Sequence, residues 1–465
     1  MVFSSISFLL YFLPAVIAVY FLVPAKIKNI VLLIASLIFY AWGEPVYIIL
    51  MIFSIGMNYS FGLLIEKARE EGAAPGFLKL HIGVITALNL ALLFYFKYCN
   101  MLIGWMNNIF SADISPLELS LPIGISFYTF QALSYVIDVY RGNTKAQRNI
   151  LDFGLYISMF PQLIAGPIVR YSTIEKQLHD HPVTISGVKA GIFYFIKGLV
   201  KKVLLANTLG ALFAQVTSGD ISDLPFLSAW LGAIAYTLQL YYDFSGYSDM
   251  AIGLGRVFGF KFLKNFDHPY VASSVTDFWR RWHISFSSWF RDYVYIPLGG
   301  NRVSKNRHIL NLLIVWLLTG LWHGASLNFI LWGLYYGVLL ILEKYLFGRF
   351  TEKHRLISRI YTGFAFIFGW MLFVFTDFGE LKSFLGSMLG SSGVFADHTT
   401  LVLLLTYGII LAAGVFFATP LPGKRILQAA KKHSIITAVI FAVMFILCLA
   451  SLAYDSYNPF LYFRF

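Results

Sequence analysis

Long apolar runs with few or no charges recur along this chain of 465 residues. A helix needs roughly 17–25 residues to cross a bilayer, and most of the runs meet or approach that length. They lie at about 5–24, 30–43, 46–65, 80–96, 122–137, 203–219, 224–242, 309–322, 324–342, 360–376, 399–423 and 435–454. Only 12% of the residues are charged, whereas a soluble domain has about 25%. The pattern predicts an all-α integral membrane protein with about 11–12 transmembrane helices.

The connections between the runs alternate in charge, which predicts the orientation of the chain. Lys and Arg gather at 26–28, 67–79, 141–148, 197–202, 344–355 and 424–432, whereas 99–121 and 218–224 have neither. Because basic loops stay in the cytoplasm, both termini are predicted to be extracytoplasmic. The opening "MVFSSISFLLYFLPAVIAVYFLVP" has no basic residue before its apolar run, so we expect a retained first span. The net charge of +12 is attributed to cytoplasmic loops, and no nucleic acid is expected as a partner.

Two segments do not fit simple crossings. Residues 153–169 are apolar but interrupted by Pro161, Gly166 and Pro167, which predicts a re-entrant segment buried in protein. Residues 244–308 contain nine Lys or Arg together with many aromatic residues, which predicts an ordered cytoplasmic cap that dips into the membrane. We find no internal repeat, and this disfavours a secondary transporter. We expect one membrane domain, 1–465, divided into N-terminal spans (1–140), a core (141–345) and C-terminal spans with a tail (346–465).

Two histidines are the candidates for catalysis. His323 interrupts the apolar stretch "LLTGLWHGASLNFILWG" at 317–333, and His283 lies in the basic cap. Ionisable residues within membrane segments are functional candidates by default, and a neutral imidazole can accept a proton near pH 7, which suits acyl transfer to a hydroxyl. Gly320 and Gly324 leave room beside His323 for a ligand or another backbone. The alternative is a buried histidine that is bonded to a backbone carbonyl.

A metal site is not expected. The two histidines are 40 residues apart in the chain without an obvious third ligand. Cys99 and Cys448 lie in or beside apolar runs, which argues against a zinc site or a disulfide framework.

Other charged residues have two interpretations each. Asp243 and Asp249 follow an apolar run, and we expect them to pair with Arg or to lie at the aqueous boundary, mainly in a structural role. Arg280, Arg281, Arg291 and Arg302 of the basic cap bind either the phosphates of a cytoplasmic donor or lipid headgroups.

The C-terminal "YNPFLYFRF" places Tyr462 among phenylalanines. It is either an exposed phenol that takes part in the chemistry or a member of an aromatic belt.

Five ordered motifs together resemble the membrane-bound O-acyltransferase (MBOAT) family, and more narrowly its alginate O-acetyltransferase (AlgI-like) branch, which is related to the D-alanyl transfer protein DltB. They are "SFYTFQALSYVIDVYRG" (126–142), "FPQLIAGPIVRY" (160–171), "YYDFSGYSDMAIGLG" (241–255), "DFWRRWHISFSSWFRDYVYIPLGGNR" (277–302) and "LTGLWHGAS" (318–326). The resemblance extends from the opening residues to "FLYFRF".

The resemblance implies a helical membrane fold with a central funnel, in which an acyl group passes from a thioester to a hydroxyl. Its near-invariant histidine matches His323, its second polar position matches His283, and a C-terminal tyrosine proposed as an acyl relay matches Tyr462. We expect Trp322 or Asn328 to supply a donor to the oxyanion. Arg280, Arg281, Arg291 and Asp277 are candidate contacts to the donor or the funnel.

The same resemblance implies substrates, partners and location. The expected donor is acetyl-CoA or an acyl-carrier protein, with no tightly bound cofactor. The expected acceptor is an extracytoplasmic polysaccharide, reached through a partner acyltransferase of the SGNH type, and the protein is expected in the bacterial cytoplasmic (inner) membrane in contact with lipid. D-alanyl transfer to teichoic acid is the related alternative, and a transporter for a small solute or lipid is the alternative from a different class.

Overall fold

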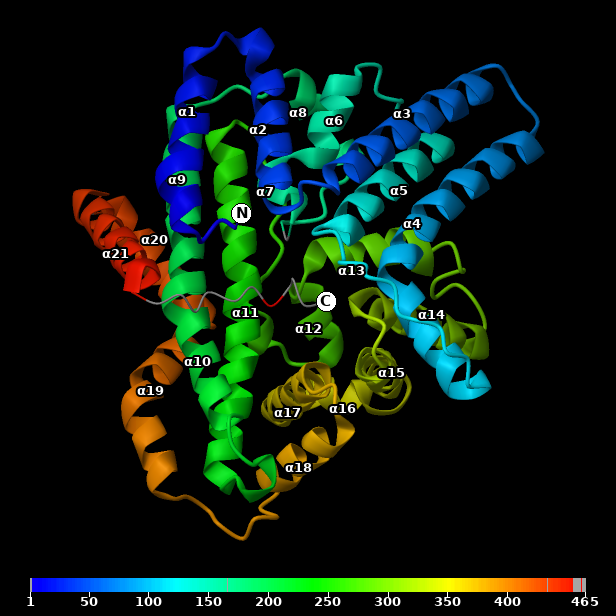
Figure 1. The fold of residues 1–465 in the computed structure, drawn as a ribbon. Helices are drawn as coiled ribbons and strands as arrows, with labels where there is room; N and C mark the ends of the chain where they lie inside the picture. Colours follow the sequence, from blue (N-terminus) through cyan, green and yellow to red (C-terminus); the bar gives the residue numbers. More distant parts are fainter. Residues whose placement is uncertain (1, 165, 433, 455–460, 462–465) are drawn as a thin grey trace. The chain divides into compact units, whose positions relative to one another are not determined.

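The computed structural model of the chain describes residues 2–164, 166–432, 434–454 and 461, and every regular element in these residues is helical (Figure 1). This confirms the predicted all-α fold. The chain divides into two compact units, Met1–Phe195 with Met250–Leu263, and Ile196–Asp249 with Lys264–Phe465. The division into 1–140, 141–345 and 346–465 stays a prediction.

Unit 1 contains the N-terminal helices. The 3₁₀ and π segments of unit 1 are η1 (Phe8–Phe12, π) and η2 (Ala25–Ile27, 3₁₀). Its α-helices are α1 (Leu13–Leu22), α2 (Lys28–Gly43), α3 (Ile48–Glu70), α4 (Pro75–Phe110), α5 (Ile125–Arg141), α6 (Ile150–Ser158), α7 (Phe160–Leu163), α8 (Tyr171–His179) and most of α9 (Ile185–Val200). Figure 1 shows α3, α4 and α5 as neighbours, and each of them contacts the other two.

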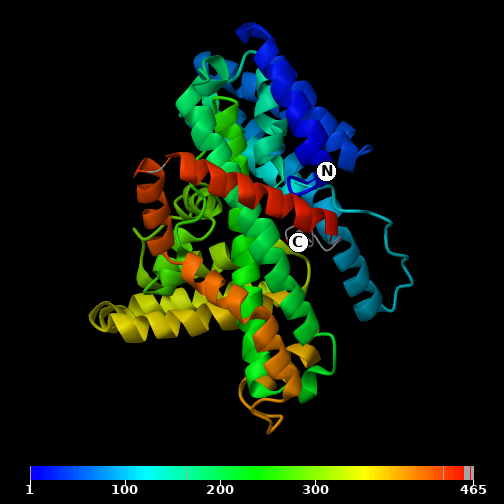
Figure 2. The same cartoon turned by 90° about the vertical axis from the view of Figure 1, so that its left-hand side faces the viewer.

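Unit 2 contains the basic cap (244–308) except for residues 250–263, which lie in unit 1. Its 3₁₀ and π segments are η3 (Lys201–Ala206, π), η4 (Ile221–Asp223, 3₁₀), η5 (Pro269–Val271, 3₁₀), η6 (Arg291–Tyr295, π) and η7 (Glu343–Phe347, π). Its α-helices are α10 (Asn207–Val216), α11 (Phe226–Val257, whose end lies in unit 1), α12 (Val275–Arg281), α13 (Ile284–Phe290), α14 (Lys305–His323), α15 (Leu327–Leu342), α16 (Gly348–Lys353), α17 (Arg355–Val374), α18 (Phe378–Met388), α19 (His398–Phe417), α20 (Pro420–Lys432) and α21 (Ser434–Tyr454). Figure 2 shows α21, in red, crossing the green helix that contains η3, which α21 contacts.

Eight helices among the described residues are long and apolar enough to cross a membrane, which makes this a multi-pass membrane protein. They are Ala25–Gly43, Ile48–Glu70, Pro75–Phe110, Ile185–Val216, Leu327–Phe347, Arg355–Val374, His398–Phe417 and Ser434–Tyr454, and Phe8–Leu22 is a shorter apolar helix. The runs 122–137, 224–242 and 309–322, also expected to cross, lie in α5, α11 and α14, which are too short or too polar for this class. Their place in the membrane stays a prediction.

The interrupted segment 153–169 forms two short helices, as its prolines suggested. α6 ends at Ser158, and Met159 has an extended ψ of 109° before α7 begins at Phe160. The N–H of Phe160 donates to the hydroxyl of Ser36 on α2 (3.0 Å). The ring of Phe160 packs against Phe39 at 5.6 Å. The break at Phe160 is therefore buried in protein, and the Phe160 N–H is bonded. Whether the segment re-enters the membrane stays a prediction.

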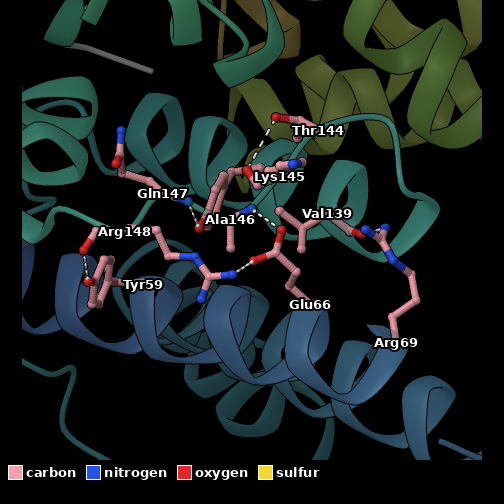
Figure 3. Close-up of polar contacts among 10 residues, drawn as sticks. Tyr59, Glu66, Arg69, Val139, Thr144, Lys145, Ala146, Gln147 and Arg148 are labelled. Atoms are coloured by element: carbon pink, nitrogen blue, oxygen red, sulfur yellow. Dashed lines mark hydrogen bonds and ion pairs between the residues drawn. The ribbon is translucent and has the colours of Figure 1, made fainter. Parts of the chain in front are cut away.

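A buried carboxylate joins the end of α3 to the connection between α5 and α6 (Figure 3). Glu66 is fully buried and accepts the N–H of Ala146 (3.0 Å) and a guanidinium N–H of Arg148 (2.6 Å). The hydroxyl of Tyr59 donates to the carbonyl of Arg148 (2.7 Å). These contacts place the basic segments near 66–71 and 141–148 side by side, which agrees with the expectation that both face the same side of the membrane.

One part of the charge analysis was wrong. Lys197, Lys201 and Lys202 were interpreted as charges of a cytoplasmic loop, but they lie within the continuous helix Ile185–Val216. The main chain opens into the π-helical segment η3 at Lys201, and π segments are frequent at functional sites. The span predicted at 203–219 is therefore longer and begins earlier.

The same lysines neutralise two aspartates of α11. The ammonium of Lys202 lies 2.7 Å from Asp243, and the ammonium of Lys201 lies 2.7 Å from Asp249. Lys197 also reaches Asp249, at 3.0 Å. The expectation that these aspartates are paired is confirmed, but the partners are lysines rather than arginines. The aspartates lie within α11, not at its end.

Candidate active site

His323 is the last residue of α14, at the turn between two tightly packed helices. A Cβ atom at Gly320 would collide with the main chain of Phe329 on α15, and one at Gly333 would collide with the main chain of Trp316 on α14. The backbones of α14 and α15 therefore touch. The two glycines were expected to leave room for a ligand or for another backbone. At Gly320 that room is filled by the backbone of α15, and at Gly324 it is filled by the ring of Phe329.

Aromatic rings surround the half-buried side chain of His323. Trp322, Trp332 and Phe373 present their rings edge-on, with centroids at 4.9, 5.0 and 5.0 Å from the imidazole. Large rings at these distances contribute packing energy and exclude water. The imidazole orientation is thus set by three rigid neighbours from α14, α15 and α17.

His283 lies in the junction between α12 and α13, outside the candidate spans, and its backbone is strained. Its φ of 44° and ψ of 56° are left-handed, a conformation that costs a non-glycine residue roughly 1–2 kcal/mol. The side chain is 3% exposed, and burial lowers the pKa of His283 to about 3. Its imidazole is therefore neutral throughout the physiological range.

The structure brings the two histidines to the same pair of aromatic rings. The ring of Phe286 lies 5.0 Å from His283 and 6.2 Å from His323. The ring of Trp322 lies 6.4 Å from His283 and 4.9 Å from His323. Residues 40 positions apart in the sequence thus form one cluster within unit 2.

Asn265 is a member of this cluster that the sequence analysis missed. Its side-chain oxygen accepts from the imidazole Nδ1 of His283 (3.2 Å) and from the N–H and the hydroxyl of Ser285 (3.1 and 2.9 Å). No motif marks it, because the contact forms only when residues 265–267 fold against 281–285.

Two further predicted residues have defined roles in packing. Trp322 contributes its ring between the two histidines, as described above. Asn328 is fully buried and its amide donates to the carbonyl of Phe373 (2.9 Å). This hydrogen bond joins the start of α15 to the end of α17. The oxyanion role predicted for these two residues stays a prediction.

A cationic pocket of about 500 Å³ adjoins the cluster. Its lining includes the cations Arg280, Arg291 and Lys344 and the polar side chains of Tyr295 and His308. Arg291 and Tyr295 come from the π-helical segment η6, and Lys344 comes from η7. The imidazole of His308 bonds the hydroxyls of Tyr295 (2.8 Å) and Tyr345 (2.7 Å), which fixes the position of this imidazole in the lining.

The predicted arginines do not all face the pocket. Arg281, which follows Arg280 directly, is paired with Asp277 (2.8 Å) and does not line the pocket. Arg291 lines it while bonded to Asp292 (2.6 and 3.1 Å).

The pocket is next to both histidines. Ile284, which lines the pocket, follows His283 in the chain. Trp279, which also lines it, lies 5.5 Å from Trp332, and Trp332 lies 5.0 Å from His323. Two aromatic side chains, Trp279 and Trp332, therefore lie between the pocket and the imidazole of His323, and the pocket lining includes the residue that follows His283.

The C-terminal tail is described at one residue, Leu461. Its N–H donates to the second carboxylate oxygen of Asp243 (2.8 Å), and the side chain of Leu461 is buried. Asp243 is therefore bonded to both Lys202 and the tail. The predicted relay Tyr462 follows Leu461 but lies outside the described residues.

Comparisons with known proteins agree on one family. The sequence profile described as MBOAT, membrane-bound O-acyltransferase family, matches residues 145–378. This range contains four of the five motifs and both histidines.

Three relatives align over most of their length. The "Probable alginate O-acetylase AlgI" of Azotobacter vinelandii is 39% identical over the whole of both chains. The protein of the same name from Pseudomonas aeruginosa is 45% identical over 80% of this chain and 72% of its own. The "Peptidoglycan O-acetyltransferase" of Helicobacter pylori is 36% identical over 86% of this chain and 81% of its own.

Proposed function

This chain belongs to the membrane-bound O-acyltransferase family and is an acyltransferase, and we propose that it passes an acetyl group across the membrane for O-acylation of an extracytoplasmic polysaccharide. The donor is a cytoplasmic thioester, either acetyl-CoA or an acyl-carrier protein. The observation that carries the proposal is that the two histidines contact the same two aromatic rings, near a cationic pocket. The names of the relatives, an alginate O-acetylase and a peptidoglycan O-acetyltransferase, support a polysaccharide acceptor.

The pocket suits the donor chemically. Both donor types carry a phosphate and a pantetheine arm that ends in the thioester. Arg280, Arg291 and Lys344 offer positive charge to the phosphate, and the aromatic wall at Trp279 offers an apolar path for the arm. The thioester would then lie at the level of His283 and His323.

In the proposed step, His323 removes the proton from the acceptor hydroxyl. The hydroxyl oxygen attacks the thioester carbonyl, the carbon–sulfur bond breaks, and the thiolate takes the proton back from the imidazolium. The products are an ester and a free thiol. A positioned general base of this kind is worth about 10²–10⁴ in rate. His283, which is neutral, assists through hydrogen bonding rather than as an acid.

In the proposed arrangement, Tyr462 receives the acyl group and hands it to an extracytoplasmic partner of the SGNH type. The support is the bond between Leu461 and Asp243, which holds the residue before Tyr462 to α11. In the onward transfer the acyl–oxygen bond breaks and the tyrosine phenolate leaves. A phenolate is a better leaving group than an alkoxide, so the onward transfer is favourable. The protein would act in the bacterial cytoplasmic membrane with both termini outside.

Purified protein in lipid vesicles tests the function. We expect one free thiol released for each ester formed when acetyl-CoA is supplied. Movement of a solute or lipid without loss of thioester would support a transporter instead. Labelled D-alanyl carrier protein, supplied as a second donor, would identify the teichoic-acid-type reaction by its product.

The donor pocket has its own prediction. Arg280→Gln and Arg291→Gln should each raise the KM for the donor by about 10- to 100-fold, because each removes a charged hydrogen bond worth about 1.5–3 kcal/mol. The measurement is the rate of thiol release against donor concentration. Arg281→Gln is the matched control, because Arg281 pairs with Asp277 away from the pocket. An equal rise in KM for all three variants would contradict this assignment.

The tail makes a second prediction. Tyr462→Phe should abolish the base-labile acyl group on the protein and reduce acylation of the polymer to the background, because the phenol oxygen is the proposed acceptor. Mass spectrometry of the C-terminal peptide measures this. Tyr454→Phe, at a phenol that is 95% exposed, is the control and should behave like the wild type. Wild-type transfer by Tyr462→Phe would reduce Tyr462 to a membrane anchor.

A further inference from the structure

We propose that Asn265 is a positioning residue for the transfer reaction. Its side-chain oxygen fixes His283 as the Nδ1–H tautomer, so that Nε2 is the atom that accepts a hydrogen from a substrate N–H or O–H. The inference rests on the proposed acyl transfer and assigns His283 a narrower role in it, that of a hydrogen-bond acceptor.

The orientation of the Asn265 amide follows from its neighbours. The main-chain N–H of Ser285 can only donate, and it lies 3.1 Å from the Asn265 side-chain oxygen. The same oxygen lies 3.2 Å from the Nδ1 of His283. An amide oxygen has no hydrogen to give, so Nδ1 must carry the proton. A neutral imidazole has one proton, which leaves the lone pair on Nε2.

The main chain around His283 is held by the same segment. The N–H of Asp267 donates to the carbonyl of Arg281 (2.9 Å), and the N–H of Ile284 donates to the carbonyl of Asn265 (2.9 Å). These bonds stand on either side of His283 and stabilise its left-handed backbone. Asn265 therefore fixes both the position of the ring and its tautomer.

The choice of an amide over a carboxylate has a physical reason. Asn265 is 1% exposed, and among the described residues its amide nitrogen has no hydrogen-bond acceptor. Such an unpaired group costs about 1–3 kcal/mol. Aspartate would accept the same three bonds without an unpaired donor, but its charge would favour the imidazolium form of His283. The amide accepts three hydrogen bonds and leaves His283 neutral.

The other charges near His283 are largely paired. Lys264 bonds Asp267 (2.6 Å), Arg281 bonds Asp277 (2.8 Å), and the two aspartates of α11 bond the lysines described above. Further titratable groups on the packed segments are Arg280, His268, His323, Tyr241 and Tyr247. Burial is the cause of the low pKa of His283, so a charge placed at position 265 should dominate its titration.

The test is the pH profile of thiol release at saturating acetyl-CoA between pH 4 and 8. In Asn265→Asp, the new carboxylate should raise the pKa of His283 by about 1–3 units. Because protonated Nε2 cannot accept, the rate of this variant should fall at pH 4 to about half of its value at pH 8 or less, whereas the wild type should keep about nine tenths. Ser285→Ala is the comparison variant, since it removes the hydroxyl that bonds the Asn265 oxygen (2.9 Å) and lies 3.5 Å from the Nδ1 of His283, but keeps the bond between Asn265 and His283 and introduces no charge. Its pH profile should be that of the wild type.

A wild-type profile for Asn265→Asp would overturn the proposal. An independent measurement uses no variant at position 265. In protein labelled with ¹⁵N-histidine, the signals lost in His283→Gln should show the proton on Nδ1, and a proton on Nε2 would overturn the proposal. If the wild type released no thiol, the proposed function would be overturned. The ¹⁵N spectrum would still show which nitrogen of His283 carries the proton.

Discussion

Replacing His323 with alanine is expected to lower acyl transfer by about 10²–10⁴ while the protein remains inserted in the membrane. The reason is the loss of the proposed general base from a position that three aromatic rings define. His323→Gln, which keeps the volume and a polar atom, should lose activity to a similar degree, because an amide cannot take up the proton. Thiol release and ester formation, measured per mole of monodisperse protein, check this result.

The control for this prediction is His398→Ala. His398 is the exposed first residue of α19 and lies outside the cluster, so its replacement should leave the rate within about twofold, as most exposed substitutions change little. Full activity in both His323 variants would show that His323 is a buried structural histidine, the alternative left open by the sequence.

The second large effect is expected at the buried pair of Lys202 and Asp243. Both residues are 2% exposed, and removing one partner leaves an uncompensated buried charge, which costs about 3–5 kcal/mol. Lys202→Met should therefore lower the free energy of unfolding by this amount. The double variant Lys202→Met/Asp243→Asn should be destabilised by less than the sum of the two single variants, because no lone charge remains.

Unfolding of the detergent-solubilised protein, followed in a double-mutant cycle, measures the coupling between these residues. Lys264→Met is the matched control, because its pair with Asp267 is largely exposed and worth about 0–1 kcal/mol. Additive effects of the two substitutions at the buried pair would mean that Lys202 and Asp243 do not stabilise each other. If the folded double variant lost acylation, the activity would depend on Asp243, whose carboxylate also bonds the C-terminal tail at Leu461.

Much of the fold followed from the sequence because hydropathy and charge act locally. Apolar length predicts a membrane helix wherever the chain is uncharged, and the prolines of 153–169 predicted the break between α6 and α7. The charges at 197–202 failed as loop indicators for a physical reason. Each lysine has a carboxylate partner on α11, 41–52 residues later in the chain. A paired lysine can lie inside a helix bundle.

The sequence identified most of the residues of the candidate site. It did not show which way their side chains point or which of them contact one another. His283 and His323 were both identified, but their common neighbours, Phe286 and Trp322, appear only in the folded chain. Arg280 and Arg281 are adjacent in sequence, yet one lines the pocket and the other pairs with Asp277, because consecutive residues of a helix point in different directions. His308, in the first turn of α14, could have been noticed as a lone histidine before an apolar run.

The central claim is that the acyl group crosses the membrane through this protein. Inverted vesicles that enclose the polymer and the extracytoplasmic partner acyltransferase test it directly. Acetyl-CoA carrying a labelled acetyl group is added outside, at the cytoplasmic face, and ester label is measured on the protein and on the enclosed polymer. We expect the label on both in the wild type with equivalent thiol release outside, and on neither in His323→Ala. Label confined to the outer compartment, or thiol release by His323→Ala at the wild-type rate, would contradict the account.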